Sequence, residues 1–259
     1  MRGKTALITG ASGGIGLELA RCCAADGCRL VLVARSRDRL ERLAAELKQQ
    51  HGTESVVLEA DLARPDAPAR VAEQAGSVDV LINNAGVGSY GPFLEQDLQR
   101  TLDMLQLNVT SLTELTRRVA PGMVTSGWGR VMNVASTAAF QPGPLMAVYY
   151  ASKAYVLSFS EALANELQGT GVTVTALCPG PTESGFQASA SMQESRLLTL
   201  FKMPSSAEVA RSGYAAMKRG KRVHITGVMN WLMAQSVRFT PRDLATWLVR
   251  KMQDKTQRP

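Results

Sequence analysis

The chain has 259 residues, of which 45% are hydrophobic, and its formal net charge is +7. A chain of this size can bury the core of one sizeable α/β domain, and no apolar run reaches the ~18 residues of a transmembrane helix. The four cysteines form no C-x-x-C pair, and only two histidines are present. We therefore expect reduced thiols and no metal site. No secretory signal is recognised at the N-terminus, so we expect a cytoplasmic protein.

A strand, a glycine-rich turn and a helix are predicted at the start of the chain. Residues 5–9 form a short apolar run, residues 10–16 are Gly-Ala-Ser-Gly-Gly-Ile-Gly, and residues 17–25 have apolar positions at helical spacing. Glycines allow backbone N–H groups to approach phosphate at a helix N-terminus, where the helix dipole favours anions. This succession is typical of a dinucleotide-binding unit, although the G-x-x-x-G-x-G spacing is a variant of the usual fingerprint.

Arginines follow the second predicted strand, which spans residues 29–33. An acidic residue at this strand end would hold the ribose 2′-hydroxyl of NAD. Arg35 can instead pair with the 2′-phosphate of NADP, with Ser36, Arg37 or Arg39 assisting. The pattern favours NADP. The alternative is that Arg37 and Arg39 belong to the exposed face of the next helix.

Five further strands are predicted over residues 55–59, 78–82, 130–135, 172–177 and 222–226. Polar residues follow several of them, at the edge where open α/β sheets bind ligands. Asp61 could accept a hydrogen bond from an adenine amino group, or it could cap the next turn. The run Asn83-Asn84-Ala85-Gly86 follows the fourth strand, and Ser136 follows the fifth with a hydroxyl that can donate to a substrate carbonyl.

Tyr149 and Lys153 are four residues apart on a helix predicted to run to about Gln168, so their side chains share one face. A nearby ammonium favours the phenolate, and the pair is therefore a candidate general acid/base. Tyr150 is three residues from Lys153, so spacing alone does not choose between the two tyrosines. Asn108 lies inside a long helical stretch predicted over residues 94–119, where it either binds a water near Lys153 or caps or kinks the helix.

In combination these motifs resemble the short-chain dehydrogenase/reductase family, from about Lys4 to Thr226. The resemblance is carried by Thr9-Gly-Ala-Ser-Gly-Gly-Ile-Gly16, Asn83-Asn-Ala-Gly86, Asn108, Ser136, Tyr149-x-x-x-Lys153 and Pro179-Gly180. It implies that Tyr149 is the acid/base, that Ser136 holds the substrate oxygen and that Asn108 holds a water. It also implies that Lys153 lowers the pKa of Tyr149 and binds the nicotinamide ribose.

The resemblance further implies a set of cofactor-binding residues. Asp61 and Leu62 would line the adenine site, Asn84 to Gly86 would border the adenosine ribose, and Thr182 would hold the nicotinamide carboxamide. The full expected set is Gly10, Ser12, Gly14, Ile15, Gly16, Arg35, Asp61, Leu62, Asn84, Ala85, Gly86, Tyr149, Lys153, Pro179, Gly180 and Thr182.

We expect a single doubly wound Rossmann-type α/β domain over residues 1–226, with a parallel sheet of about seven strands and a substrate lid at 183–204. The expected function is NADP(H)-dependent hydride transfer to or from an apolar carbonyl or alcohol, with a small molecule and no nucleic acid as partner. The alternatives are an NAD(H)-preferring alcohol dehydrogenase and a non-catalytic nucleotide-sensing protein. A serine hydrolase using Ser136 would lack the G-x-S-x-G elbow.

A basic helical extension is expected over residues 227–259, beyond the point at which many members of the family end. Residues 202–259 carry 12 Lys and Arg against 3 Asp and Glu. The helix predicted over 241–252, with Thr240 as its cap, has an apolar face of Leu244, Trp247, Leu248 and Met252. We expect a homo-oligomer, preferably a dimer, whose interface or local core includes Trp231 or Trp247. Peripheral contact with a membrane is the less favoured alternative.

Overall fold

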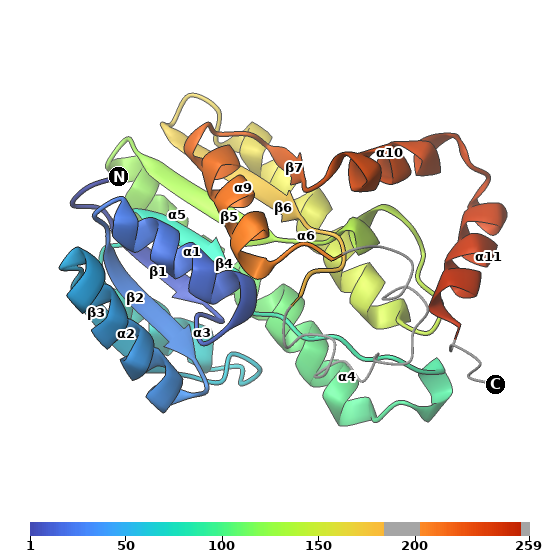
Figure 1. Ribbon diagram of the computed structural model, residues 1–259, viewed down its shortest axis with the longest axis horizontal. Helices are drawn as coiled ribbons and strands as arrows, with labels where there is room; N and C mark the ends of the chain where they lie inside the picture. The colour runs from blue at the N-terminus through green and yellow to red at the C-terminus, as the bar shows by residue number, and fades with distance from the viewer. Residues whose placement is uncertain (184–202, 255–259) are drawn as a thin grey trace.

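Seven parallel strands form one sheet in the order β3-β2-β1-β4-β5-β6-β7, in a computed structural model that describes residues 1–183 and 203–254 (Figure 1). The strands are β1 (Thr5–Thr9), β2 (Arg29–Ala34), β3 (Ser55–Glu59), β4 (Val80–Asn83), β5 (Gly129–Val134), β6 (Val172–Cys178) and β7 (Val223–Ile225). The α-helices are α1 (Gly14–Ala25), α2 (Arg37–His51), α3 (Ala67–Ala75), α4 (Leu98–Leu105), α5 (Leu112–Thr125), α6 (Ala147–Glu166), α9 (Ser206–Lys218), α10 (Val228–Ser236) and α11 (Arg242–Gln253). The predicted doubly wound α/β fold is confirmed.

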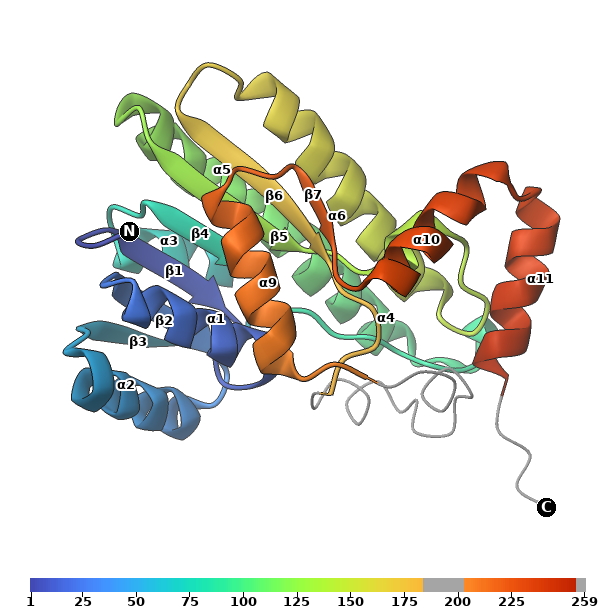
Figure 2. The ribbon, with the colours of Figure 1, turned by 45° about the horizontal axis from the view of Figure 1, so that its top comes forward.

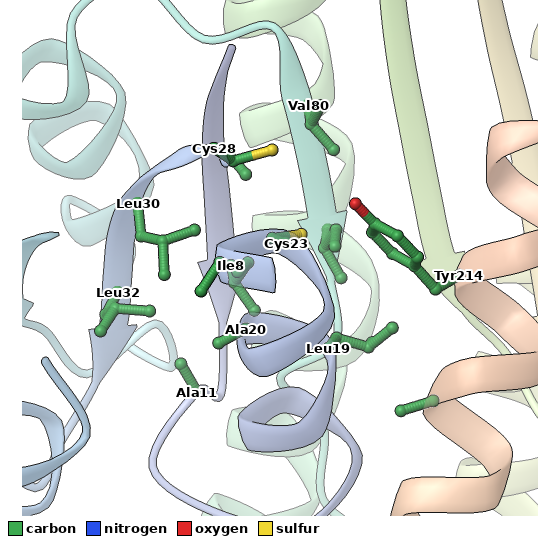
Figure 3. Packing of buried hydrophobic residues seen from close by; sticks show 14 of the residues in the cluster. Ile8, Ala11, Leu19, Ala20, Cys23, Cys28, Leu30, Leu32, Val80 and Tyr214 are labelled. Carbon is green, nitrogen blue, oxygen red and sulfur yellow. The ribbon is translucent and has the colours of Figure 1, made fainter. Parts of the chain in front are cut away.

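The sheet is buried on both faces, which explains why its strands are apolar without alternation. In β1, Ile8 points to the side covered by α1, α2 and α9, whereas Leu7 points to the side covered by α3, α5 and α6. Figure 3 shows the first of these layers, in which Leu19 and Cys23 of α1 and Tyr214 of α9 lie close to the strands. This packing aligns the carboxyl ends of the strands along one edge.

The long helix predicted over residues 94–119 is interrupted. A short 3₁₀ turn (Phe93–Glu95) precedes α4, and a π-helical segment (Gln106–Ser111) separates α4 from α5. Asn108 lies within the π-helical segment, so it stands at a local break in the α-helical hydrogen-bond pattern. Helix α3 was not predicted from the sequence, because its 9 residues give too short an apolar pattern. Two more 3₁₀ turns occur at Thr137–Phe140 and Val237–Phe239.

The C-terminal helices α10 and α11 lie at the end of the molecule that is remote from α2 and β3 (Figures 1 and 2). Helix α11 packs on its own domain through Ala245, Val249 and Gln253, which are all buried. The centre of the predicted apolar face does not pack on the domain within this chain, since Trp247 is 54% exposed. Trp231 is 50% exposed, so neither tryptophan belongs to a local core.

The start of α11 also differs from the prediction. The helix begins at Arg242 with Pro241 as its N-cap, and no side chain caps it. The Thr240 hydroxyl instead donates to the Ser236 carbonyl, 2.9 Å away, at the end of the preceding turn. Within residues 1–183 and 203–254, none of the helices has both the length and the apolar character needed to cross a bilayer.

Candidate active site

A cleft of about 690 Å³ runs along the carboxyl ends of the strands. It is lined by the glycine-rich turn after β1, by Arg35 after β2, by Asn84–Val87 after β4 and by Ser136 after β5. The cleft continues past α6 and residues 179–182 to α10 and α11. Most of the site residues predicted from the sequence therefore border one continuous space.

The glycine-rich turn is held against β4 by two polar side chains. The Asn84 Nδ2 atom donates to the Thr9 and Gly10 carbonyls at 2.9 and 3.2 Å, and the Thr9 hydroxyl accepts from the backbone N–H groups of Asn84 and Ala85. Gly10 has a φ of +67°, which disfavours a side chain. A Cβ built on Gly16 would lie 2.4 Å from the Gly10 carbonyl oxygen. The turn thus forms a cradle of exposed backbone at the start of α1, which fits a phosphate group.

At the adenosine end of the expected site, some of the predicted residues border the cleft and others do not. Arg35 and Arg39 border the cleft, whereas Arg37 forms an exposed ion pair with Glu41 at 2.7 Å, as an ordinary helix surface would. Asp61 does not line the cleft, and its Oδ1 atom accepts from the backbone N–H of Ala63, which is the turn-capping alternative.

Leu62 and Gly16 also lie outside the lining of the cleft. Leu62 is buried in the core, and its carbonyl accepts from the Ser111 hydroxyl at 2.6 Å. The structure therefore does not bring Asp61 and Leu62 together with the other predicted cofactor residues. The remaining predicted positions, from Gly10 to Thr182, border the cleft.

Asn108 and Lys153 converge behind Gly86. A Cβ built on Gly86 would lie 3.2 Å from the Asn108 Oδ1 atom and 3.3 Å from the Lys153 Nζ atom. Asn108 accepts from the Val87 N–H and donates to the Val87 carbonyl and the Ser152 hydroxyl. Its amide is therefore fixed by three hydrogen bonds beside Gly86, which Lys153 also approaches, although Asn108 does not itself line the cleft.

Tyr149 and Ser136 form the polar centre of the cleft. Burial raises the pKa of the Tyr149 phenol well above its ordinary value, and a hydrogen bond with Ser136 opposes this rise. The expected lowering of the Tyr149 pKa by Lys153 is not seen, because the Nζ atom lies 5.8 Å from the tyrosine ring centroid and donates to the Val134 carbonyl. Burial dominates here, since the phenolate would lose its hydration.

The two neighbouring tyrosines have different partners. The Tyr150 hydroxyl accepts a hydrogen bond from the Gln253 amide at 2.8 Å, on the side of α11, whereas Tyr149 bonds to Ser136. Helix geometry separates them because residues one apart point about 100° away from each other. This difference distinguishes the tyrosines, which the spacing to Lys153 does not.

The other ionisable groups near the site are also affected by burial. Burial lowers the pKa of Lys153 to about 8, so the ammonium form still predominates at pH 7. Burial raises the pKa of the Cys178 thiol to about 12, which keeps it protonated and argues against its use as a nucleophile.

Two residues near the cleft were missed by sequence reasoning. Thr9 belongs to the quoted glycine motif, and its place at the end of β1 could have marked it as a tie between strands. Gln253 offered no signal, because a lone amide on an amphipathic helix is usually solvated. The predicted lid falls mostly on residues 184–202, which lie outside the described residues. Its two ends meet where the Glu183 N–H donates to the Pro204 carbonyl at 3.0 Å.

Comparison with known proteins gives concordant matches. A family model described as short chain dehydrogenase matches residues 4–195. A short chain dehydrogenase of Pseudocercospora fijiensis is 37% identical over 190 residues, covering 71% of this chain and 61% of the relative. A very-long-chain 3-oxoacyl-CoA reductase of Anas platyrhynchos is 37% identical over 186 residues, covering 68% and 59%. The chain thus matches only about three fifths of the length of these relatives.

Among solved structures, a short-chain dehydrogenase from Sphingobium yanoikuyae in complex with NADPH has a TM-score of 0.82 and 35% sequence identity. The match covers 91% of this chain and 94% of that structure. The likeness therefore extends beyond the strand–turn–helix start to the C-terminal third of the chain.

Proposed function

Because the chain belongs to the short-chain dehydrogenase family, we propose that it is an NADP(H)-dependent oxidoreductase that interconverts an apolar carbonyl compound and its alcohol. The observation that carries this proposal is the single cleft that joins the glycine-rich turn to Ser136, Tyr149 and Lys153. A nucleotide-sensing protein would need the turn but not the hydrogen-bonded Ser136–Tyr149 pair. The non-catalytic alternative therefore leaves this pair unexplained.

In this proposal the nicotinamide cofactor supplies or accepts the hydride when it is bound. Ser136 donates a hydrogen bond to the substrate oxygen and orients the carbonyl. In the reductive direction Tyr149 gives its phenolic proton to that same oxygen, and in the oxidative direction it takes the proton back. Its raised pKa suits the proton-carrying form that starts the reduction.

Lys153 and Asn108 both lie close to Gly86 and have separate proposed roles. The Lys153 ammonium, which donates to the Val134 carbonyl, would also hold the nicotinamide ribose. Asn108 is fixed by Val87 and Ser152, and we propose that it holds a water on the path by which the proton is replaced. Gly10–Gly16 and Asn84–Gly86 would hold the phosphates and the adenosine ribose, and Pro179–Thr182 the carboxamide.

The preference for NADP over NAD is supported by Arg35 and Arg39. Both line the cleft after β2, where an acid would favour NAD, and Arg35 would pair with the 2′-phosphate. The bound NADPH named for the Sphingobium structure is in keeping with this assignment. The adenine contacts predicted for Asp61 and Leu62 receive no support, since neither residue borders the cleft.

The wider organisation is proposed as follows. Residues 1–226 form the dinucleotide-binding and catalytic domain, and residues 227–259 form a basic helical C-terminal extension. The half-exposed Trp231 and Trp247 favour a homodimer that covers them, in the cytoplasm, over attachment to a membrane. Burial of these two side chains against a partner subunit would explain why they are exposed in the single chain.

A panel of carbonyl compounds, assayed by oxidation of NADPH, tests the function directly. Tyr149→Phe keeps the ring but removes the proton donor, so we expect turnover to fall by roughly 10²-fold or more with nearly unchanged NADPH affinity. Tyr155→Phe is the matched control, because Tyr155 lies on the same helix, bonds to Thr113 and does not line the cleft. Retained activity in Tyr149→Phe, with loss in Tyr150→Phe, would contradict the assignment.

A further inference from the structure

A buried amide fastens helix α11 to the catalytic helix α6. The Gln253 side chain is only 1% exposed, and its Nε2 atom donates to the Tyr150 hydroxyl at 2.8 Å and lies 3.7 Å from the Met146 sulfur. The Tyr90 hydroxyl donates to the main-chain carbonyl of Gln253. We call Gln253, Tyr150, Met146 and Tyr90 the Gln253 latch. Because Tyr150 directly follows Tyr149, the latch sets the position of α11 relative to the catalytic hydroxyl.

The side of α11 that faces the cleft is apolar. Val249 is 2% exposed and belongs to the same hydrophobic cluster as Tyr149 and Tyr150, with Met252 packed against it. Ala245 and Leu248 also line the cleft. The helix therefore presents aliphatic side chains to the space beside Tyr149.

The basic character of the extension does not reach this space. Among the described lining residues that come from α10 and α11, none carries a charge. Arg250 on α11 points instead to an exposed ion pair with Asp254 at 3.0 Å. A charged substrate group placed against this wall would lose its hydration without gaining a counter-ion, which is costly.

We propose that α11 is the wall of the substrate pocket that selects the apolar arm of a neutral ketone. In this arrangement Val249 sets how large an arm is accepted, and the Gln253 latch holds the wall beside Tyr149. The inference rests on the proposed function, because it takes the reacting carbonyl to lie at Ser136 and Tyr149. Gln253 is a positioning residue, since it acts through Tyr150 and the helix that carries it.

The test uses methyl ketones whose alkyl arm grows from ethyl to octyl. Each ketone is measured by kcat/KM with NADPH and, separately, by the shift it causes in the melting temperature of the full chain with NADP. Val249→Phe should lower both readouts for the longest arms, with kcat/KM falling about tenfold or more. The ethyl ketone should change by less than about twofold. Val249→Ala should move the optimum toward longer arms.

Leu244→Phe is the matched control for the added ring. Leu244 lies on the same helix, is exposed and does not line the cleft. This variant should leave the whole ketone profile unchanged. Equal profiles for Val249→Phe and the unaltered protein, in binding and in turnover, would overturn the wall while leaving the proposed function intact.

The latch is tested by Gln253→Leu and Tyr150→Phe, which remove the two ends of one hydrogen bond. Each should raise KM for long-arm ketones several-fold more than it raises KM for the ethyl ketone, and each should speed amide hydrogen exchange in α11. The double variant should be no worse than either single variant, because the shared bond is lost once. Additive effects, or α11 amides that exchange as in the unaltered protein, would overturn the latch.

Failure of the proposed function gives a different result. The protein could bind the ketones with an arm-length preference that Val249→Phe changes and yet turn none of them over. That result would support α11 as the pocket wall and refute the proposed oxidoreductase activity. Absence of any arm-length preference in binding would refute the wall whatever the turnover.

Discussion

Gly16→Ala tests directly whether the close packing of the glycine-rich turn matters for stability and cofactor binding. Gly16 is in the first turn of α1, and a Cβ there would lie 2.3 Å from the Asn84 Nδ2 atom, 2.4 Å from the Gly10 carbonyl oxygen and 2.9 Å from the Gly10 carbonyl carbon. Two of these three atoms belong to the backbone of the turn, which cannot rotate away as the end of a side chain can. The turn or the start of α1 must therefore move.

The magnitude follows from two opposing effects. Overpacking of this kind costs about 1–3 kcal/mol. The Asn84 amide would also lose one or both of its hydrogen bonds to the Thr9 and Gly10 carbonyls, at about 0.5–1.5 kcal/mol each. Alanine in a helix regains about 0.5–1 kcal/mol relative to glycine. We therefore expect a net loss of roughly 0.5–5.5 kcal/mol in the free energy of unfolding.

Gly122→Ala is the matched control, because it makes the same change inside helix α5. A Cβ on Gly122 would meet nothing within 4 Å, so this variant should gain about 0.5–1 kcal/mol. Urea denaturation measures both variants, and NADPH titration should show weaker binding only for Gly16→Ala. If the two variants have equal stability and bind NADPH equally, the close packing of the turn against Asn84 does not matter and the argument fails.

Three further predictions concern cofactor choice, pH and assembly. The protein should bind NADPH at least several-fold more tightly than NADH, and Arg35→Asp should weaken or reverse this ratio; equal affinities at fixed ionic strength in the unaltered protein would contradict it. Because the pKa of Lys153 is lowered to about 8, its charged form is lost as pH rises through 8, so kcat/KM for reduction should fall over that range. Lys153→Met should show low activity without this limb, and the same descending limb in that variant would exclude Lys153 as its cause. Sedimentation should detect a dimer that Trp231→Ala or Trp247→Ala weakens, whereas a monomer that binds anionic vesicles in a salt-sensitive way would favour the membrane alternative.

The amino-acid sequence by itself determined the fold and the place of the cleft. Buried parallel strands require apolar side chains on both faces, and close approach of backbone requires glycine, so both leave local patterns that can be recognised. Arg35, Asn84 and Ser136, which follow three of the strands, border one cleft as predicted, because parallel strands all end on the same side of the sheet. Asp61, which follows β3, does not. Ser136, Tyr149 and Lys153 are brought together there as expected.

Only the tertiary structure decided the features that depend on contacts between distant segments. The Tyr149 pKa is set by burial, which no local spacing reports, and Asp61 caps a turn although its position suited a ligand equally well. In α11 the sequence contains two overlapping faces, one with Trp247 and Leu248 and one with Val249 and Gln253. The second is buried: Val249 packs in the cluster that contains Tyr149 and Tyr150, and the Gln253 amide donates to Tyr150. Contacts with residues about a hundred positions away cannot be read from helical periodicity.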